Sequence, residues 1–131
     1  MIFVDTGAWY ASLVPTVSDH ARAVQWLGTN RPPLLTTDYV IDETLTLLRV
    51  RGERRRALVL GARFFNHALA EIHKITADDL TLAWQTFEQF DDKGWSFTDC
   101  TSKVVMQKLN ITVAFSFDHH FRQFGTIQVV P

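Results

Sequence analysis

Cysteine and net charge are the two features that this 131-residue sequence most clearly lacks. It holds one cysteine, Cys100, so no disulfide can form within the chain, which argues against a disulfide-stabilised secreted domain. Its 13 Lys and Arg nearly balance 14 Asp and Glu, for a formal net charge of −1. The field of the whole molecule therefore does not attract a polyanion, and affinity for nucleic acid must come from local patches or bound metal.

Long hydrophobic runs and a leader-like amino terminus are also lacking. The apolar runs, such as 2–4 and 113–115, are far shorter than the roughly 20 residues that cross a bilayer as a helix. Residues 1–5 have neither the basic leader nor the long apolar stretch of a secretory signal. We therefore expect no membrane span and a location in the reducing cytoplasm.

Hydrophobic residues, by contrast, are abundant. They make up 47% of the chain and include ten Phe and four Trp, which predicts a well-filled core rather than a disordered chain. A length of 131 residues is typical of one globular domain. We expect a single domain over residues 1–131.

Short β-rich runs alternate along the chain with segments of helical periodicity. Strands are predicted over 2–4, 34–35, 71–75, 112–117 and 127–130, and helices over 8–13, 19–27, 38–50, 53–67, 76–90 and 99–109. The alternation predicts an α/β fold, a three-layer sandwich with a mostly parallel central sheet. Its ligand crevice is expected at the carboxyl ends of the strands.

Three aspartates are candidates for that crevice. Asp5 and Asp118 each come directly after an apolar strand run, so both are expected at the functional edge of the sheet. Asp99 opens a predicted helix after a loop and could reach the same edge. Each also has a plain alternative, because Asp after a strand or loop is a favoured helix N-cap, and Ser96 with Asp99 resembles a capping box.

Glu43 is the fourth candidate, and helical phase separates it from its neighbour. Asp42 falls on the polar face of its predicted helix, whereas Glu43 lies between Val40 and Leu47 at the margin of the buried stripe. A carboxylate there needs a compensating cation. A helix-edge glutamate that swings into water is the alternative.

Converging carboxylates repel one another unless a cation is present. Oxygen ligands without a set of His or Cys suit Mg²⁺ or Mn²⁺, and Mg²⁺ commonly bridges to a substrate phosphate. Together the four acids predict metal-dependent phosphodiester hydrolysis, with one ion or two.

The chain resembles the VapC-type PIN domain. The motifs that carry the resemblance are V-D-T-G at 4–7, the helical Glu43, S-F-T-D-C at 96–100 and A-F-S-F-D-H-H-F at 114–121. It runs over essentially the full chain, in matching order and spacing. The resemblance implies a PIN-like fold and a Mg²⁺- or Mn²⁺-dependent endoribonuclease with Asp5, Glu43, Asp99 and Asp118 as its acidic set.

The resemblance also implies partners. It indicates the toxin of a type II toxin–antitoxin pair, with an RNA substrate, a small VapB-like antitoxin that covers the cleft, and a homodimer. Thr6 and Thr98 match hydroxyl positions beside two of the acids, where they could orient a carboxylate or water. Ordinary cap or turn hydroxyls are the alternative for both.

Basic and aromatic residues give weaker signals. Arginines concentrate in one helical hairpin and could contact RNA or a partner, or simply form a solvated face: Arg49, Arg51, Arg54, Arg55, Arg56 and Arg63. Trp9 and Tyr10 could stack an unpaired base or pack in a core or dimer interface. His119 and His120 invite an acid–base role that metal-assisted cleavage does not require, and Cys100 is expected to pack rather than act as a nucleophile.

A catalytically silent PIN fold that binds RNA or protein is the main rival function, although the four retained acids argue against it. Two phosphoryl-transfer folds fit poorly. A haloacid-dehalogenase-type phosphotransferase needs a second Asp where this chain has Gly7. A response-regulator receiver needs paired acids after the first strand.

Overall fold

The computed structural model describes residues 1–131 and contains a five-stranded sheet. Its strands are β1 (Ile2–Val4), β2 (Leu34–Thr37), β3 (Glu71–His73), β4 (Val113–Phe115) and β5 (Gln128–Val130). They are arranged in the order β3-β2-β1-β4-β5, and every neighbouring pair is parallel. The α/β prediction is confirmed, and the sheet is wholly parallel.

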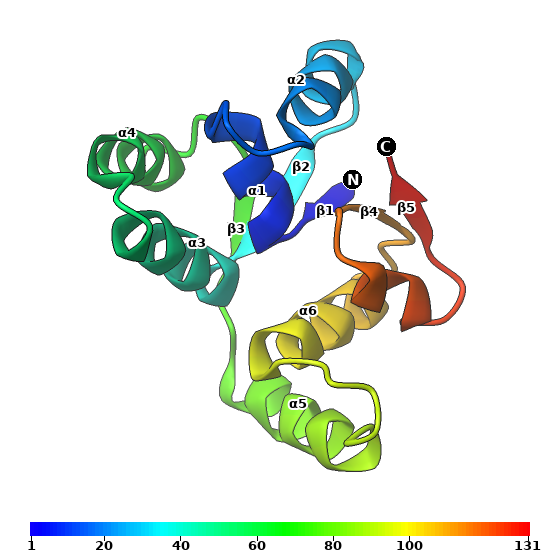
Figure 1. Cartoon of the computed structure of the whole chain (residues 1–131). Helices are drawn as coiled ribbons and strands as arrows, with labels where there is room; N and C mark the ends of the chain where they lie inside the picture. Colours follow the sequence, from blue (N-terminus) through cyan, green and yellow to red (C-terminus); the bar gives the residue numbers. More distant parts are fainter.

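Six α-helices and one 3₁₀ helix connect the strands (Figure 1). They are α1 (Thr6–Leu13), α2 (His20–Thr29), α3 (Asp38–Val50), α4 (Arg54–Phe65), α5 (Ala77–Gln89), α6 (Phe97–Lys108) and the 3₁₀ helix η1 (His119–Gln123). None of the helices is long and apolar enough to cross a membrane.

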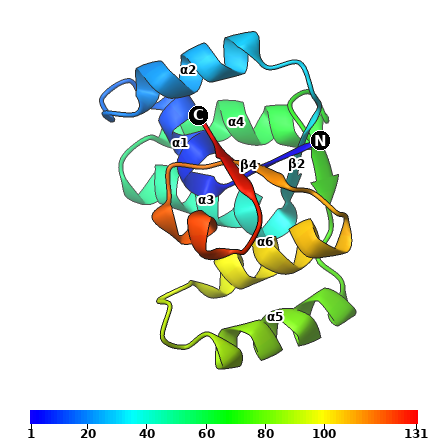
Figure 2. The same ribbon diagram turned by 90° about the vertical axis from the view of Figure 1, so that its right-hand side faces the viewer.

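The strand order decides which face each helix covers. The chain steps from β1 to β2 to β3 in one direction, and right-handed crossovers place α1–α4 on one face. It then returns past β1 to β4 and β5, which places α5, α6 and η1 on the other face. Figures 1 and 2 show α5 and α6 side by side, on the side of the molecule away from α1, α2 and α4. After β1 the chain runs to one face of the sheet, and after the neighbouring strand β4 it runs to the other. Where the connections of two adjacent strands diverge in this way, a crevice opens at the carboxyl ends of the strands.

The core lies on both faces of the central strands. All three residues of β1 are buried because strands flank it on each side and helices cover it above and below. Phe3 packs against Phe121 of η1, with ring centroids 6.1 Å apart, and Phe115 packs against Trp26 of α2 at 4.3 Å. Helices on opposite faces are thus fixed to the two strands that flank the crevice.

A buried carboxylate joins β3 to the second helical layer. Asp79 of α5 is fully buried, and its side chain contacts His73 at 2.9 Å and Lys108 of α6 at 3.0 Å. Burial alone would raise the pKa of Asp79, but hydrogen bonds from His73, the Thr76 backbone and Lys108 hold it well below its usual value. The ionised Asp79 therefore ties three elements together.

The structure corrects the expected boundaries around the crevice. Helix α6 begins at Phe97, two residues earlier than predicted, because Ser96 and Asp99 form a complete capping box. Strand β4 ends at Phe115, and a 3₁₀ helix that was not predicted follows Asp118. Five residues of 3₁₀ helix have no apolar period that sequence inspection could detect.

Candidate active site

Four carboxylates from distant parts of the chain line one cavity at the carboxyl ends of the strands. Asp5 follows β1, Glu43 lies on α3, Asp99 on α6, and Asp118 after β4. The cavity has a volume of about 200 Å³, and its other lining residues are Thr6, Gly7, Val40, Leu47, Thr98 and Ser102. The structure thus brings together every acid and both threonines that the sequence singled out.

Asp5 combines the two roles that the sequence left open. Its Oδ1 accepts a hydrogen bond from the Ala8 N–H at 3.0 Å and so caps α1. Its Oδ2 accepts from the Ser116 hydroxyl at 2.7 Å, and the residue is 6% exposed. Capping therefore fixes the carboxylate at the cavity wall instead of removing it from the site.

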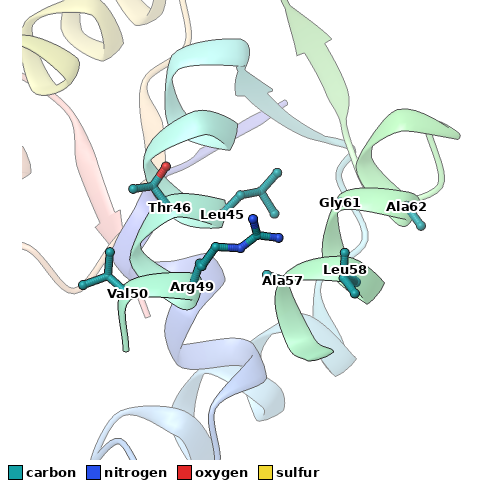
Figure 3. Close-up of a pocket in the computed structure, with 8 residues that line it drawn as sticks. All are labelled: Leu45, Thr46, Arg49, Val50, Ala57, Leu58, Gly61 and Ala62. Carbon is teal, nitrogen blue, oxygen red and sulfur yellow. The ribbon is translucent and has the colours of Figure 1, made fainter. Parts of the chain in front are cut away.

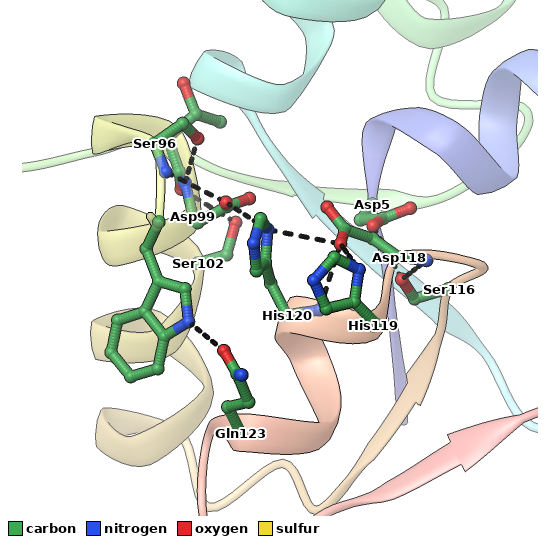
Figure 4. Close-up of polar contacts among 11 residues, drawn as sticks. Asp5, Ser96, Asp99, Ser102, Ser116, Asp118, His119, His120 and Gln123 are labelled. Atoms are coloured by element: carbon green, nitrogen blue, oxygen red, sulfur yellow. Dashed lines mark hydrogen bonds and ion pairs between the residues drawn. The ribbon is translucent and has the colours of Figure 1, made fainter. Parts of the chain in front are cut away.

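Asp99 and Asp118 are each held by one oxygen and leave the other without a protein partner. Asp99 Oδ2 accepts from the Ser96 N–H at 3.0 Å, and Asp118 Oδ1 accepts from the His120 N–H at 2.9 Å (Figure 4). No hydrogen bond or ion pair involves Asp99 Oδ1 or Asp118 Oδ2. Both free oxygens remain available to a ligand.

Glu43 and Thr6 contribute further unpaired oxygens. Glu43 is half-buried and makes no hydrogen bond or ion pair, while its neighbour Asp42 is exposed. Thr6 Oγ1 is the one buried side-chain polar atom of the chain without a hydrogen-bond partner. Because buried polar groups are nearly always satisfied, an orphaned hydroxyl in an acidic cavity indicates a place for a bound ion or water.

The cavity disfavours the ionised forms of the Asp5 and Asp99 carboxyl groups. Burial raises the pKa of Asp5 from 3.8 to about 7, against the lowering effect of the Ser116 and Ala8 hydrogen bonds, and the charges of Asp118 and Asp99 raise it further. Burial is also the main reason that the pKa of Asp99 is raised. A divalent cation in the cavity would reverse both effects.

Ser116 and His120 contact the acids of the cavity, although the sequence did not single out Ser116 and gave His120 little weight. The Ser116 hydroxyl donates to Asp5 and accepts from the Asp118 N–H at 3.0 Å, so it links two of the acids. His120 Nδ1 lies 3.2 Å from Asp118 Oδ1 and 3.6 Å from Asp99 Oδ2 (Figure 4). Ser116 stands one residue beyond the last β1–β4 pair, Val4 and Phe115, which explains its place beside Asp5.

The structure rejects base stacking by the aromatic pair after Asp5. Trp9 is 3% exposed, donates its indole N–H to Thr36 Oγ1 and meets Phe64 edge-on at 5.0 Å. Tyr10 is also buried. Cys100 is buried beside Asp99, and burial raises the pKa of its thiol to about 11, so it stays protonated at neutral pH.

The arginines of the α3–α4 hairpin divide into two groups. Arg51 lies over the Tyr10 ring at 5.0 Å, and Arg56 pairs with Glu53 at 2.6 Å, so both already have partners within the chain. The other four arginines of the expected set are exposed and form no ion pair: Arg49, Arg54, Arg55 and Arg63. Figure 3 shows Arg49 over a groove between α3 and α4 that is lined mainly by apolar side chains.

Comparison with known proteins places the chain in a family. The PIN domain family model matches residues 2–127. VapC20 of Mycobacterium tuberculosis, named a 23S rRNA-specific endonuclease, is 34% identical over 131 residues, which cover all of this chain and 99% of VapC20. Its crystal structure, described as that of a sarcin-ricin loop cleaving toxin, matches with a TM-score of 0.92 at 33% identity over 100% of both chains.

A more distant structure shares the fold. The FitAcB structure from Neisseria gonorrhoeae matches with a TM-score of 0.73 at 15% identity, over 100% of this chain and 97% of that one. The family model, the whole-chain relative and the parallel sheet with its acidic crevice agree with one another. The chain therefore belongs to the PIN domain family.

Proposed function

We propose that this chain is a Mg²⁺- or Mn²⁺-dependent endoribonuclease, the toxin of a toxin–antitoxin pair, and that residues 1–131 act as one PIN domain. The observation that carries the proposal is the single cavity lined by Asp5, Glu43, Asp99 and Asp118. The whole-chain similarity to an endonuclease supports the same conclusion. RNA as the substrate also favours the cytoplasm as the place of action.

The residues present suit a hard divalent cation. Asp5, Asp99 and Asp118 would hold it, with Glu43 completing the acidic set, because carboxylate oxygens without Cys are the ligands that Mg²⁺ and Mn²⁺ prefer. The unpaired Thr6 hydroxyl adds one more oxygen at the same cavity. When bound, such an ion neutralises the scissile phosphate and favours ionisation of the attacking water.

The chain's own residues have distinct tasks in this proposal. Backbone N–H groups hold Asp5 and Asp118 by one oxygen each, which fixes the direction of the remaining lone pairs. The Ser116 hydroxyl donates to the Asp5 carboxylate and accepts from the Asp118 backbone N–H, so it fixes Asp5 relative to the backbone that carries Asp118. Glu43, held by no hydrogen bond, is free to turn into the cavity, where it would help hold the ion or accept a proton from water. Thr98 is a supporting residue beside Asp99.

Large-subunit ribosomal RNA is the first substrate to test, because the relative that matches the whole chain is named a 23S rRNA-specific endonuclease. A labelled RNA hairpin with the sarcin-ricin loop sequence is compared with a hairpin of the same length and a scrambled loop. We expect cleavage of the first with Mg²⁺ or Mn²⁺ and none with EDTA. Cutting both hairpins equally would refute the substrate but not the ribonuclease activity.

Substitutions test the site itself. Asp5→Asn, Asp99→Asn and Glu43→Gln should each abolish or greatly reduce cleavage, whereas Asp42→Asn, on the exposed side of α3, should leave it unchanged. If the wild type binds RNA but never cuts it, the silent binding module is the correct function. If cleavage persists in all three site variants, the cavity is not the active site.

The groove between α3 and α4 supports the proposed antitoxin. It has a volume of about 460 Å³ and is lined by Leu45, Thr46, Arg49, Val50, Ala57, Leu58, Gly61 and Ala62 (Figure 3). Its apolar walls suit the apolar face of an amphipathic helix, with Arg49 available to an acidic side chain. Leu58→Asp should weaken capture of the adjacent gene product, while Phe65→Asp, equally apolar and exposed on α4 but outside the groove, should not.

The homodimer and the arginine contact to RNA also belong to this proposal. Helix α5 exposes Leu82, Trp84 and Phe87, and the last two stack at 5.9 Å, which gives a surface for a second copy. Trp84→Glu should then convert the dimer to a monomer in sedimentation experiments. If Arg54 and Arg55 contact phosphates, replacing both by Gln should reduce the salt dependence of RNA affinity by about two in log–log slope.

A further inference from the structure

A group of nitrogen and oxygen atoms stands at the rim of the acidic cavity, on η1. His119 Nδ1 lies 3.7 Å and His120 Nδ1 lies 3.2 Å from Asp118 Oδ1, and the three potential ligand atoms are within 4.8 Å of one another. Figure 4 shows both imidazoles beside the Asp118 carboxylate. The ribonuclease chemistry proposed above needs neither histidine.

These atoms approach one another without hydrogen bonding. No hydrogen bond involves either imidazole, although the separations are short. The backbone N–H of His120 already occupies Asp118 Oδ1 from the side of the chain. The side chain of His119 is 77% exposed and lies beside Asp118 and the His120 ring. Neutral imidazoles at these distances form no ion pair with Asp118, and two such nitrogens near one carboxylate oxygen fit a shared metal ion.

The spacing matches the size of a zinc ion's coordination shell. With Zn–N and Zn–O distances near 2.1 Å, ligand atoms of a tetrahedral site stand about 3.4 Å apart. The measured separations from Asp118 Oδ1, 3.2 and 3.7 Å, bracket that value. The exposed His119 can rotate to shorten the remaining edge, and water can fill the fourth position.

We propose that Asp118, His119 and His120 form a second metal site, for a transition-metal ion of the Zn²⁺ class, which shares Asp118 with the acidic cavity. Imidazole nitrogen favours Zn²⁺, Ni²⁺ and Cu²⁺ over Mg²⁺, whereas the acidic cavity offers only oxygen. Asp118 connects the two sites, because its Oδ1 faces the histidines and its Oδ2 is free for the cavity. The site does not depend on ribonuclease activity.

The test measures metal binding directly on the full-length protein after chelation and dialysis. Co²⁺ is added as a spectroscopic probe, since nitrogen coordination with few ligands gives it intense visible absorption, and Zn²⁺ affinity is measured by competition. The double variant His119→Ala/His120→Ala should lose the Co²⁺ bands and weaken Zn²⁺ binding by at least about tenfold. His119→Ala alone, at an exposed position, gives a variant whose folding is not at risk and should weaken binding as well.

Two control variants make the result specific. His67→Asn removes an exposed histidine whose φ of 60° asparagine tolerates, and it should keep the wild-type Co²⁺ spectrum. Glu43→Gln changes the acidic cavity but not the rim, and it should keep the spectrum while losing RNA cleavage. Retention of the bands and of Zn²⁺ affinity in the double histidine variant would overturn the proposal. Loss of the Co²⁺ absorption bands in the Glu43→Gln variant would also overturn the proposal, because the ion would then lie among the carboxylates of the cavity.

Discussion

Replacing Asp5 with asparagine should stabilise the metal-free protein, although it should inactivate the enzyme. Asp5 is 6% exposed and its pKa rises from 3.8 to about 7, chiefly by burial. Each unit by which a pKa is raised corresponds to about 1.4 kcal/mol between the two protonation states. Keeping Asp5 ionised in the folded, metal-free protein therefore costs about 4 kcal/mol at most.

The sign of the pH dependence follows from the same values. Between pH 4 and 7 the folded protein retains a proton on Asp5 that the unfolded chain has released, so Asp5 makes the protein less stable as pH rises. The asparagine variant has no carboxyl group at this position, so its stability does not change with pH for this reason. Its advantage over the wild type should grow from near zero below pH 4 to about 4 kcal/mol at pH 8.

Urea unfolding at pH 4, 6 and 8 in EDTA measures the difference in free energy of unfolding between Asp5→Asn and the wild type. The control Asp42→Asn, at an exposed position on α3, should differ from the wild type by no more than about 0.5 kcal/mol. Mg²⁺ at about a hundred times its dissociation constant should recover about 2.7 kcal/mol for the wild type alone. An asparagine variant that is less stable than the wild type at pH 8 in EDTA, or an advantage that does not change with pH, would refute the electrostatic account.

Three further substitutions test other parts of the structure. Ser116→Ala removes the hydroxyl that donates to Asp5 at 2.7 Å, and it should raise the Mg²⁺ concentration needed for half-maximal cleavage by roughly 10- to 100-fold without loss of folding. Asp79→Asn leaves Lys108 without its buried partner and should lower the free energy of unfolding by about 1.5–3 kcal/mol at pH 7, with a smaller loss as pH falls below about 4. Phe64→Ala empties a fully buried position under α1 and should cost about 3–5 kcal/mol in urea unfolding.

Local patterns in the sequence marked the four acids that line the cavity as candidates, and the family resemblance implied the same set. Asp5 and Asp118 each follow a short apolar run, and the order of strands and helices already implied that such positions share one edge of a parallel sheet. Glu43 was separated from Asp42 by helical phase alone, and the structure leaves Asp42 exposed and turns Glu43 to the cavity. These inferences need only the period of an element and its direction.

The residues that sequence reasoning missed depend on long-range geometry. Ser116 reaches Asp5 because Val4 pairs with Phe115 across β1 and β4, and no local pattern fixes a register between segments about 110 residues apart. His120 reaches Asp99 through a short 3₁₀ turn that leaves no periodic signal. Burial of Trp9 likewise depends on α4 packing over α1, which the sequence of α1 alone does not specify.

The sequence offered helix capping and a place in the crevice as alternatives for the three aspartates, and the structure shows that each aspartate does both. Asp5 caps α1, Asp99 completes the capping box of α6, and Asp118 caps η1, so three helix starts converge on the cavity. Backbone N–H groups at a helix start carry partial positive charge, and they stabilise a carboxylate that burial and its neighbours destabilise. They can satisfy only some of its lone pairs, and the remaining lone pairs face the cavity. Caps therefore hold the acids close together in the absence of metal, and a bound cation would relieve the repulsion that the caps leave.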